Sequence, residues 1–115
     1  MAKEQAERGR DAAPPGDDPL RCVVCEHRIT ERGYRREMSG AHEHLFVNPA
    51  GVSFRVACFV AAPGCAYVGL TSQAFSWFPG FRWQVAVCGR CCAHVGWIFR
   101  CVGEQFHGLI ATALR

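Results

Sequence analysis

Residues 22–25 read CVVC and residues 88–91 read CGRC, and 62 residues separate the two pairs. A C-x-x-C pair folds as a tight turn whose two thiolates point at one ion. Two pairs therefore supply the four sulfurs of a tetrahedral zinc site, at about 2.3 Å from the metal. The predicted ligands of one structural Zn²⁺ ion are Cys22, Cys25, Cys88 and Cys91. Such an ion joins the two ends of a single domain.

Eight cysteines in 115 residues also allow a secreted disulfide scaffold. The first 19 residues, however, are charged and rich in proline and glycine, and they contain no apolar stretch that could act as a signal peptide. We therefore expect a reducing, cytoplasmic environment, where disulfides are rare. No apolar run approaches the roughly 20 residues that cross a bilayer, so we predict a soluble protein without a membrane partner.

The other thiols are predicted to be structural. Cys92 neighbours Cys91 and is an alternative ligand, but the C-x-x-C spacing favours Cys91. Cys58, Cys65 and Cys101 lie in apolar surroundings, where cysteine behaves as a small buried hydrophobe more often than as a nucleophile.

A second metal site is conceivable at His42-Glu43-His44. Alternate positions of one strand bring the two imidazoles to the same face. No further ligand type lies nearby in the sequence, so a plain surface segment is the simpler interpretation.

Charge is distributed unevenly along the chain. Residues 1–19 carry three basic and five acidic side chains, a balance of −2, and the whole chain carries +3, so residues 20–115 carry +5. Four thiolates on one Zn²⁺ add about −2, and the remaining positive charge is spread over separate arginines. Nucleic-acid binding is not expected from such a distribution. Residues 1–19 are predicted to be a disordered leader, and residues 20–115 the folded domain.

From residue 20 onward, turns and alternating apolar residues predict a mainly β fold. Residues 45–47 run into Asn48-Pro49-Ala50-Gly51, where proline in second place and glycine in fourth favour a type I turn. Residues 52–60 then alternate between apolar and polar, which is the period of a half-buried strand. A hairpin is therefore predicted here, with further strands over residues 67–70, 82–87 and 94–100.

The last part of the chain gives two further expectations. Alternation within residues 94–100 predicts two faces, one with Val95, Trp97 and Phe99 and the other with His94, Ile98 and Arg100. Apolar residues after that strand have helical spacing, at Phe106, Leu109, Ile110, Ala113 and Leu114. The spacing favours a C-terminal helix, although Gly108 weakens it.

All three tryptophans, Trp77, Trp83 and Trp97, fall within 21 residues. Core packing is the simplest role for such large side chains in a small domain. Trp77, however, lies beside the turn Phe78-Pro79-Gly80, while Trp83 and Trp97 lie on strands that flank the same C-x-x-C pair. Together they can form an aromatic box for a cation, at about 0.5–2 kcal/mol per contact, or for a small flat ring.

The chain contains five motifs in the order CVVC, NPAG, FSWFPGFRW, CGRCCAHVGWIF and FHGLI. Together they resemble the motifs of the CULT domain, the thalidomide-binding domain of cereblon, and most closely those of its short single-domain bacterial relatives. The resemblance spans residues 20–115. It implies a β-tent, in which two antiparallel sheets meet at an angle and are pinned by one structural zinc. It also implies a ligand cage whose walls match Trp77, Trp83 and Trp97 and whose floor matches Phe99.

The family's cage accepts glutarimide, thalidomide-like, uridine and related cyclic imide or uracil-type rings, free or as a C-terminal cyclic imide on a modified peptide. By resemblance, the main chain reads the imide edge, through the carbonyl of Phe75 and the N–H of Trp77, with Ser76 between them in the same site. Three further residues match the pocket mouth and its rim: Asn48, Pro49 and Phe54.

Two departures from the family limit what the resemblance implies. Animal cereblons carry a histidine where this chain has Phe75, so one side-chain hydrogen bond to the imide is expected to be missing. No Lon-like domain and no segment for docking a ubiquitin-ligase adaptor is recognised in the sequence. The expectation is a non-catalytic module that binds a small ring.

Other functions are less compatible with the sequence. CGRCCAHVGWIF also resembles the zinc segment of B-type methionine sulfoxide reductases, and Arg100-Cys101 partly matches their catalytic motif. Trp97 replaces the second histidine of that segment, and the reductase cysteine lies much farther past the zinc pair than Cys101 does. A reader of methylated amines could use the same cage, but no carboxylate neighbours the tryptophans. A zinc-ribbon nucleic-acid binder is disfavoured by the scattered arginines.

Overall fold

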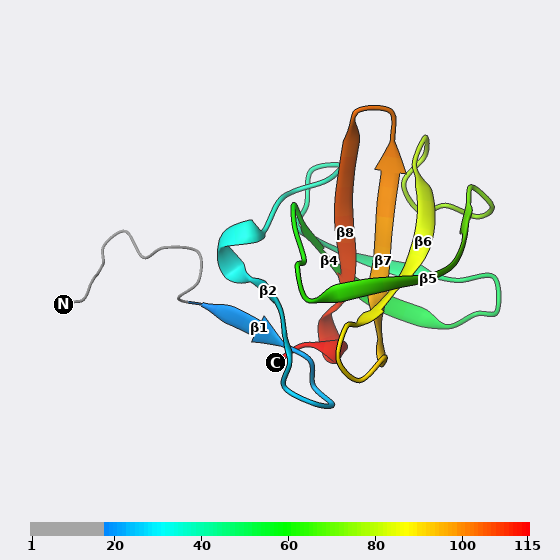
Figure 1. Ribbon diagram of the computed structural model, residues 1–115. Helices are drawn as coiled ribbons and strands as arrows, with labels where there is room; N and C mark the ends of the chain where they lie inside the picture. The colour runs from blue at the N-terminus through cyan, green and yellow to red at the C-terminus, as the bar shows by residue number, and fades with distance from the viewer. Residues whose placement is uncertain (1–17) are drawn as a thin grey trace.

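The computed structural model describes residues 18–115, so the leader predicted over residues 1–19 lies outside the described residues except for its last two. The described chain forms eight strands in two antiparallel sheets (Figure 1). The strands are β1 (Pro19–Arg21), β2 (Arg28–Glu31), β3 (Glu43–Val47), β4 (Ser53–Phe59), β5 (Cys65–Ser72), β6 (Arg82–Cys88), β7 (His94–Cys101) and β8 (Glu104–Ile110). The predicted mainly β fold is confirmed.

The two sheets differ in size. Six strands form the larger one, in the order β3-β4-β8-β7-β6-β5, and β1 pairs with β2 in the smaller one. The small sheet is tied to the end of the chain, because the backbones of Arg21 and Arg115 exchange two hydrogen bonds of 2.8 Å. Figure 1 shows the C-terminus beside β1 and β2. The first C-x-x-C pair therefore begins where β1 meets the C-terminal residue.

The predicted hairpin is formed by β3 and β4. The N–H of Gly51 donates to the carbonyl of Asn48 at 2.8 Å and closes the four-residue turn, and the φ of +86° at Gly51 suits glycine. The side-chain Oδ1 of Asn48 accepts a second bond, from the N–H of Val52 at 2.9 Å. The strands predicted over residues 67–70 and 82–87 are also confirmed, within β5 and β6.

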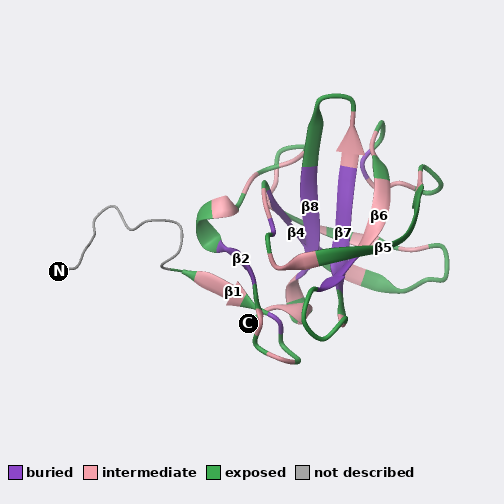
Figure 2. Ribbon diagram, in the orientation of Figure 1, coloured by how far each residue is buried: buried purple, intermediate pink, exposed green. Residues whose placement is uncertain are grey.

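The larger sheet is buried on both faces along its central strands, as Figure 2 shows for β4, β7 and β8. One face packs around Phe59 and Leu109, next to the cysteine pairs. The other face packs around Phe99 and Phe106. Cys58 is fully buried, as expected, and the edge strand β5 is mostly exposed.

The predicted faces of the strand over residues 94–100 are wrong at its start. Ala86 pairs with Gly96 and Val87 pairs with His94, so Val95 is an extra residue, a bulge. Val95 consequently packs on the opposite face from Trp97. Next to the bulge the backbones approach closely, because a Cβ on Gly96 would lie 2.2 Å from the carbonyl oxygen of Gly108.

The C-terminal helix is also wrong. Residues Glu104–Ile110 form strand β8, and only the short 3₁₀ turn Ala111–Ala113 is helical there. β8 pairs with β4 on one side and β7 on the other, and this tertiary pairing overrides the local spacing. A second 3₁₀ turn spans Arg32–Tyr34, and within residues 18–115 neither turn is long or apolar enough to span a membrane.

Candidate binding pocket and cysteine cluster

The side chains of Cys22, Cys25, Cys88 and Cys91, the cysteine cluster, converge on one point. Their four Sγ atoms all lie within 4.8 Å of one another. The Cys22–Cys91 and Cys25–Cys88 sulfurs are 3.7 and 3.6 Å apart, whereas a tetrahedral zinc with bonds of about 2.3 Å has sulfur–sulfur edges of about 3.8 Å. A disulfide needs about 2.05 Å. The cluster therefore has the donor set and spacing that could hold zinc.

The two C-x-x-C turns share one backbone design. In each, the residue after the second cysteine has a left-handed φ, +67° at Glu26 and +66° at Cys92. The N–H of that residue donates to the carbonyl of the first cysteine, at 2.8 Å for Glu26 and 2.9 Å for Cys92. Cys92 thus closes the turn and lies outside the cluster, as the spacing predicted.

Backbone amides also stabilise the thiolate of Cys88. The N–H groups of Arg90 and Cys91 donate to its Sγ at 3.4 and 3.5 Å. Burial acts to raise the pKa of Cys88, but hydrogen bonds from the backbone of Cys91 and Arg90 and from neighbouring thiols outweigh it and lower this pKa to about 7. Such N–H···S bonds are suited to a metal-bound thiolate.

The remaining thiols and the histidine pair do not form a second site. Burial raises the pKa of Cys58 to about 11 and that of Cys65 to about 12, which disfavours the nucleophilic thiolate. His42 hydrogen-bonds the carbonyl of Arg36, and His44 stacks on a phenylalanine ring. Among residues 18–115, the cysteine cluster alone has the geometry of a metal site.

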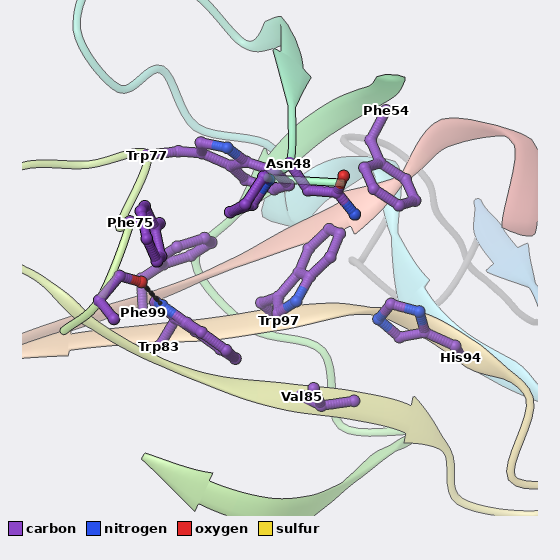
Figure 3. A pocket seen from close by; sticks show the side chains of 11 residues that line it. Asn48, Phe54, Phe75, Trp77, Trp83, Val85, His94, Trp97 and Phe99 are labelled. Atoms are coloured by element: carbon purple, nitrogen blue, oxygen red, sulfur yellow. Dashed lines mark hydrogen bonds between the residues drawn. The ribbon is translucent and has the colours of Figure 1, made fainter. Parts of the chain in front are cut away.

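A pocket of about 480 Å³ lies on the face of the large sheet that carries Phe99 (Figure 3). It is lined by Asn48, Pro49, Phe54, Ala74, Phe75, Trp77, Trp83, Val85, His94, Trp97 and Phe99. Eight of the nine residues predicted from the sequence are in this lining. The exception is Ser76, whose Oγ donates instead to the carbonyl of Phe78 at 3.1 Å and so shapes the local turn. The volume falls within the usual range for small-molecule sites.

The cage consists of Trp77, Trp83 and Trp97, and its three rings do not pack alike. The rings of Trp77 and Trp97 meet edge to face, with centroids 4.8 Å apart and planes at 83°. Trp97 also meets Phe54 at 5.2 Å. Within the described chain Trp83 packs against the cluster around Phe99 without a stacked or edge-to-face ring pair, and a 2.8 Å hydrogen bond from its Nε1 to the carbonyl of Ala74 holds it. The free space of the cage therefore lies between Trp83 and the Trp77–Trp97 pair.

Two main-chain groups of the loop that lines the pocket are unpaired within the described chain. The carbonyl of Phe75 and the N–H of Trp77 make no hydrogen bond to any group within residues 18–115. The Trp77 side chain is fixed separately, because Nε1 donates to the carbonyl of Val47 at 3.2 Å. An acceptor and a donor thus stand two residues apart on a loop that lines the pocket.

Three lining residues were missed from the sequence: Ala74, Val85 and His94. Val85 lies two positions after Trp83 on β6, so strand alternation could have identified it. His94 reaches the pocket because of the bulge at Val95, and its ring meets Trp97 at 4.9 Å. Its Nε2 lies 3.0 Å from the carbonyl of Gly96, which can only accept, so Nε2 carries the hydrogen.

No lining residue carries a carboxylate, and His94 is the only titratable side chain among them. Aromatic cages that bind cations gain from nearby negative charge. The lining therefore favours a neutral, flat ligand.

The fold and the site together define a class of protein domain. It is mainly β, with a four-cysteine cluster next to one face of its large sheet and an aromatic pocket on the other face. No family model matches the chain. Several proteins named cereblon match part of it, among them the following three. The Xenopus tropicalis protein is 37% identical over 75 residues, or 61% of this chain and 17% of that protein. The Danio rerio protein is 35% identical over 74 residues, or 60% and 17%. The Drosophila melanogaster protein is 38% identical over 61 residues, or 49% and 10%.

These comparisons support a cereblon-like domain, and the CULT assignment is consistent with them. The matched part spans between a tenth and a sixth of the curated relatives. The likeness therefore concerns the domain described here and not the remainder of those proteins.

Proposed function

We propose that this domain is a non-catalytic receptor for a small uncharged ring with an imide edge, such as a glutarimide or a uracil. The observation that carries the proposal is the unpaired main-chain pair, the Phe75 carbonyl and the Trp77 N–H, beside an aromatic pocket without charge. The ligand is a free ring or a cyclic imide at the end of a peptide.

The polar edge supplies selectivity. The imide N–H donates to the Phe75 carbonyl, and an imide oxygen accepts from the Trp77 N–H. A buried polar group left unpaired costs about 1–3 kcal/mol, so a ring without this edge is rejected. The main chain provides both partners without loss of side-chain entropy.

The cage supplies affinity. Indole faces remove the apolar edge of the ring from water, which contributes about 25 cal/mol per Å² of buried apolar area. The space beside Trp83, which forms no stacked or edge-to-face ring pair within the described chain, admits a flat ring without separating Trp77 from Trp97.

Zn²⁺ is the proposed occupant of the cysteine cluster. Four cysteine sulfurs at tetrahedral spacing, with no fifth Cys, His, Asp or Glu in the group among residues 18–115, are typical of structural rather than catalytic zinc. The ion joins the turn after β1 to the turn after β6 and thereby holds the small sheet against the large one.

No observation favours the alternatives. Arg100, which a reductase would use beside Cys101, donates to Gln84 at 3.1 Å and packs over the ring of Tyr67. A methylated-amine reader lacks its carboxylate in the lining.

Titration of the domain with glutarimide, uridine and N-methylglutarimide, followed by tryptophan fluorescence, tests the proposal. Glutarimide is expected to give a saturable change. The N-methyl compound lacks the imide N–H and is expected to bind at least tenfold more weakly. Equal binding of the two, or no binding of any ring, contradicts the proposed function.

A further inference from the structure

Phe75 combines two unfavourable features. Its φ is +56°, a left-handed conformation that bulky residues rarely adopt. Its side chain is also 77% exposed, although it lines the pocket. Strained backbone of this kind persists where the surrounding structure enforces it, and it is frequent at ligand-binding positions.

The backbone on either side of Phe75 is held in place. Ala74 accepts from Trp83 Nε1 at 2.8 Å, and its N–H donates to Ser72 Oγ at 3.0 Å. The N–H of Ser76 donates to the carbonyl of Gln73 at 3.3 Å. These hydrogen bonds therefore fix the backbone from which the Phe75 side chain projects.

The Phe75 ring itself is largely exposed to solvent. It makes no ring contact within the described residues, whereas Trp77 and Trp97 each contact several aromatic rings. It can therefore turn about its side-chain bonds without breaking any interaction of the loop. Figure 3 shows Phe75 on the same side of Trp97 as Trp83 and Phe99. This is the side where the cage has free space.

The pocket is larger than one ring needs. Its volume of about 480 Å³ equals that of roughly sixteen water molecules in the liquid. Glutarimide and uracil each have only eight non-hydrogen atoms. A bound ring therefore leaves room for an attached group between the cage and the exposed Phe75 ring.

We propose that the Phe75 side chain closes over the bound ring as a fourth wall and makes the domain prefer rings that carry a flat, aromatic substituent. The inference rests on the proposed function. Aromatic pairs add to the gain from burial alone, and an affinity gain of about three- to tenfold is expected from one such pair.

A matched ligand pair tests this preference: 3-benzamidoglutarimide and 3-acetamidoglutarimide share the imide and the amide and differ in one flat ring. Wild-type protein is expected to bind the benzamide about three- to tenfold more tightly. In Phe75→Gly, which keeps the main-chain carbonyl and suits the left-handed φ, the two affinities should become equal, while the melting temperature should not fall. Phe75→Tyr keeps the ring and should keep the preference.

The outcomes separate the two proposals. If wild-type protein binds neither compound, the proposed function fails. If Phe75→Gly binds both compounds and still prefers the benzamide as wild type does, the role of Phe75 is wrong while the proposed function stands. If wild-type protein binds both equally, the preference does not exist.

Discussion

Trp83 and Cys88 stand at opposite ends of one strand, β6, and the same neighbouring strand pairs with both. Cys65 of β5 pairs with Cys88, and Ser72 of β5 pairs with Trp83. One ladder therefore connects the cysteine cluster to a wall of the pocket. Loss of structure at the cysteine cluster is therefore expected to disturb the pocket wall as well, along the β5–β6 pair.

Replacement of a cluster cysteine should unfold the domain. Structural zinc contributes about 10–16 kcal/mol in zinc-finger peptides, comparable to the 5–15 kcal/mol that stabilises a whole domain. Cys88→Ser, or a strong chelator, is therefore expected to abolish the cooperative melting transition seen by circular dichroism. Cys92→Ser is the matched control, because Cys92 is exposed and outside the cluster. A Cys88→Ser protein that melts like wild type would show that the cluster is not a structural metal site.

Truncation to alanine should have different effects at two of the cage tryptophans, Trp97 and Trp83. Trp97 is only 9% exposed and belongs to the core, so Trp97→Ala is expected to cost about 3–5 kcal/mol of stability along with binding. Trp83 is half-buried and forms no stacked or edge-to-face ring pair within the described chain. Trp83→Ala should therefore lower glutarimide affinity at least tenfold with a smaller loss of stability.

Calorimetric titration and thermal melts of the two variants measure both effects. Leu70→Ala is a suitable control, because Leu70 is 90% exposed and outside the pocket lining. Undiminished binding by Trp83→Ala would remove Trp83 from the site.

Gly108 supports the floor of the pocket. A Cβ at this position would lie 2.8 Å from Cε2 of Phe99 and 2.9 Å from Cγ1 of Val56. Gly108→Ala is therefore expected to cost about 1–3 kcal/mol in urea denaturation, as overpacking does, and to weaken ligand binding because Phe99 must move.

A double-mutant cycle with Phe99→Leu tests the cause of that loss. The smaller leucine should leave room for the new methyl group, so the two substitutions together should cost less than the sum of their separate costs. Additive costs would mean that the contact with Phe99 is not the reason.

Local motifs explain what could be predicted about this fold. The C-x-x-C turns carry their geometry within four residues, and the NPAG turn and the alternation after it define the β3–β4 hairpin. Most of the pocket lining was predicted from resemblance rather than from periodicity, because its residues come from separate segments of the chain.

Contacts between distant residues explain the errors. Strand β8 is central and buried on both faces, so its apolar residues do not alternate, and their spacing imitates a helix. The bulge that brings His94 to the pocket lies beside the close approach of Gly96 to Gly108, which no local pattern reveals. The pairing of His107 with Tyr67 was equally hidden, since the two residues are 40 positions apart.

His107 lies on β8 with 3% of its surface exposed, and its Nε2 is 2.5 Å from the hydroxyl of Tyr67. Its Nδ1 is buried without a hydrogen-bond partner in the described chain. Burial, with a smaller effect of the Arg100 charge, lowers the pKa of His107 to about 4. The imidazole is therefore neutral in the folded protein at pH values where it is already protonated in the unfolded chain.

This pKa predicts the direction of a pH dependence. Between the unfolded pKa of about 6.5 and the folded pKa of about 4, the unfolded chain binds more protons. The free energy of unfolding should therefore fall as pH decreases through this window, by about 3 kcal/mol in total. His107→Gln lacks the titrating group, so the stability difference between wild type and variant, measured by urea denaturation at pH 7.0, 5.5 and 4.5, should shift towards the variant as pH falls. Acid protonation of the cysteine cluster affects both proteins and cancels in this difference. A difference that stays constant with pH would show that His107 titrates alike in the folded and unfolded chains.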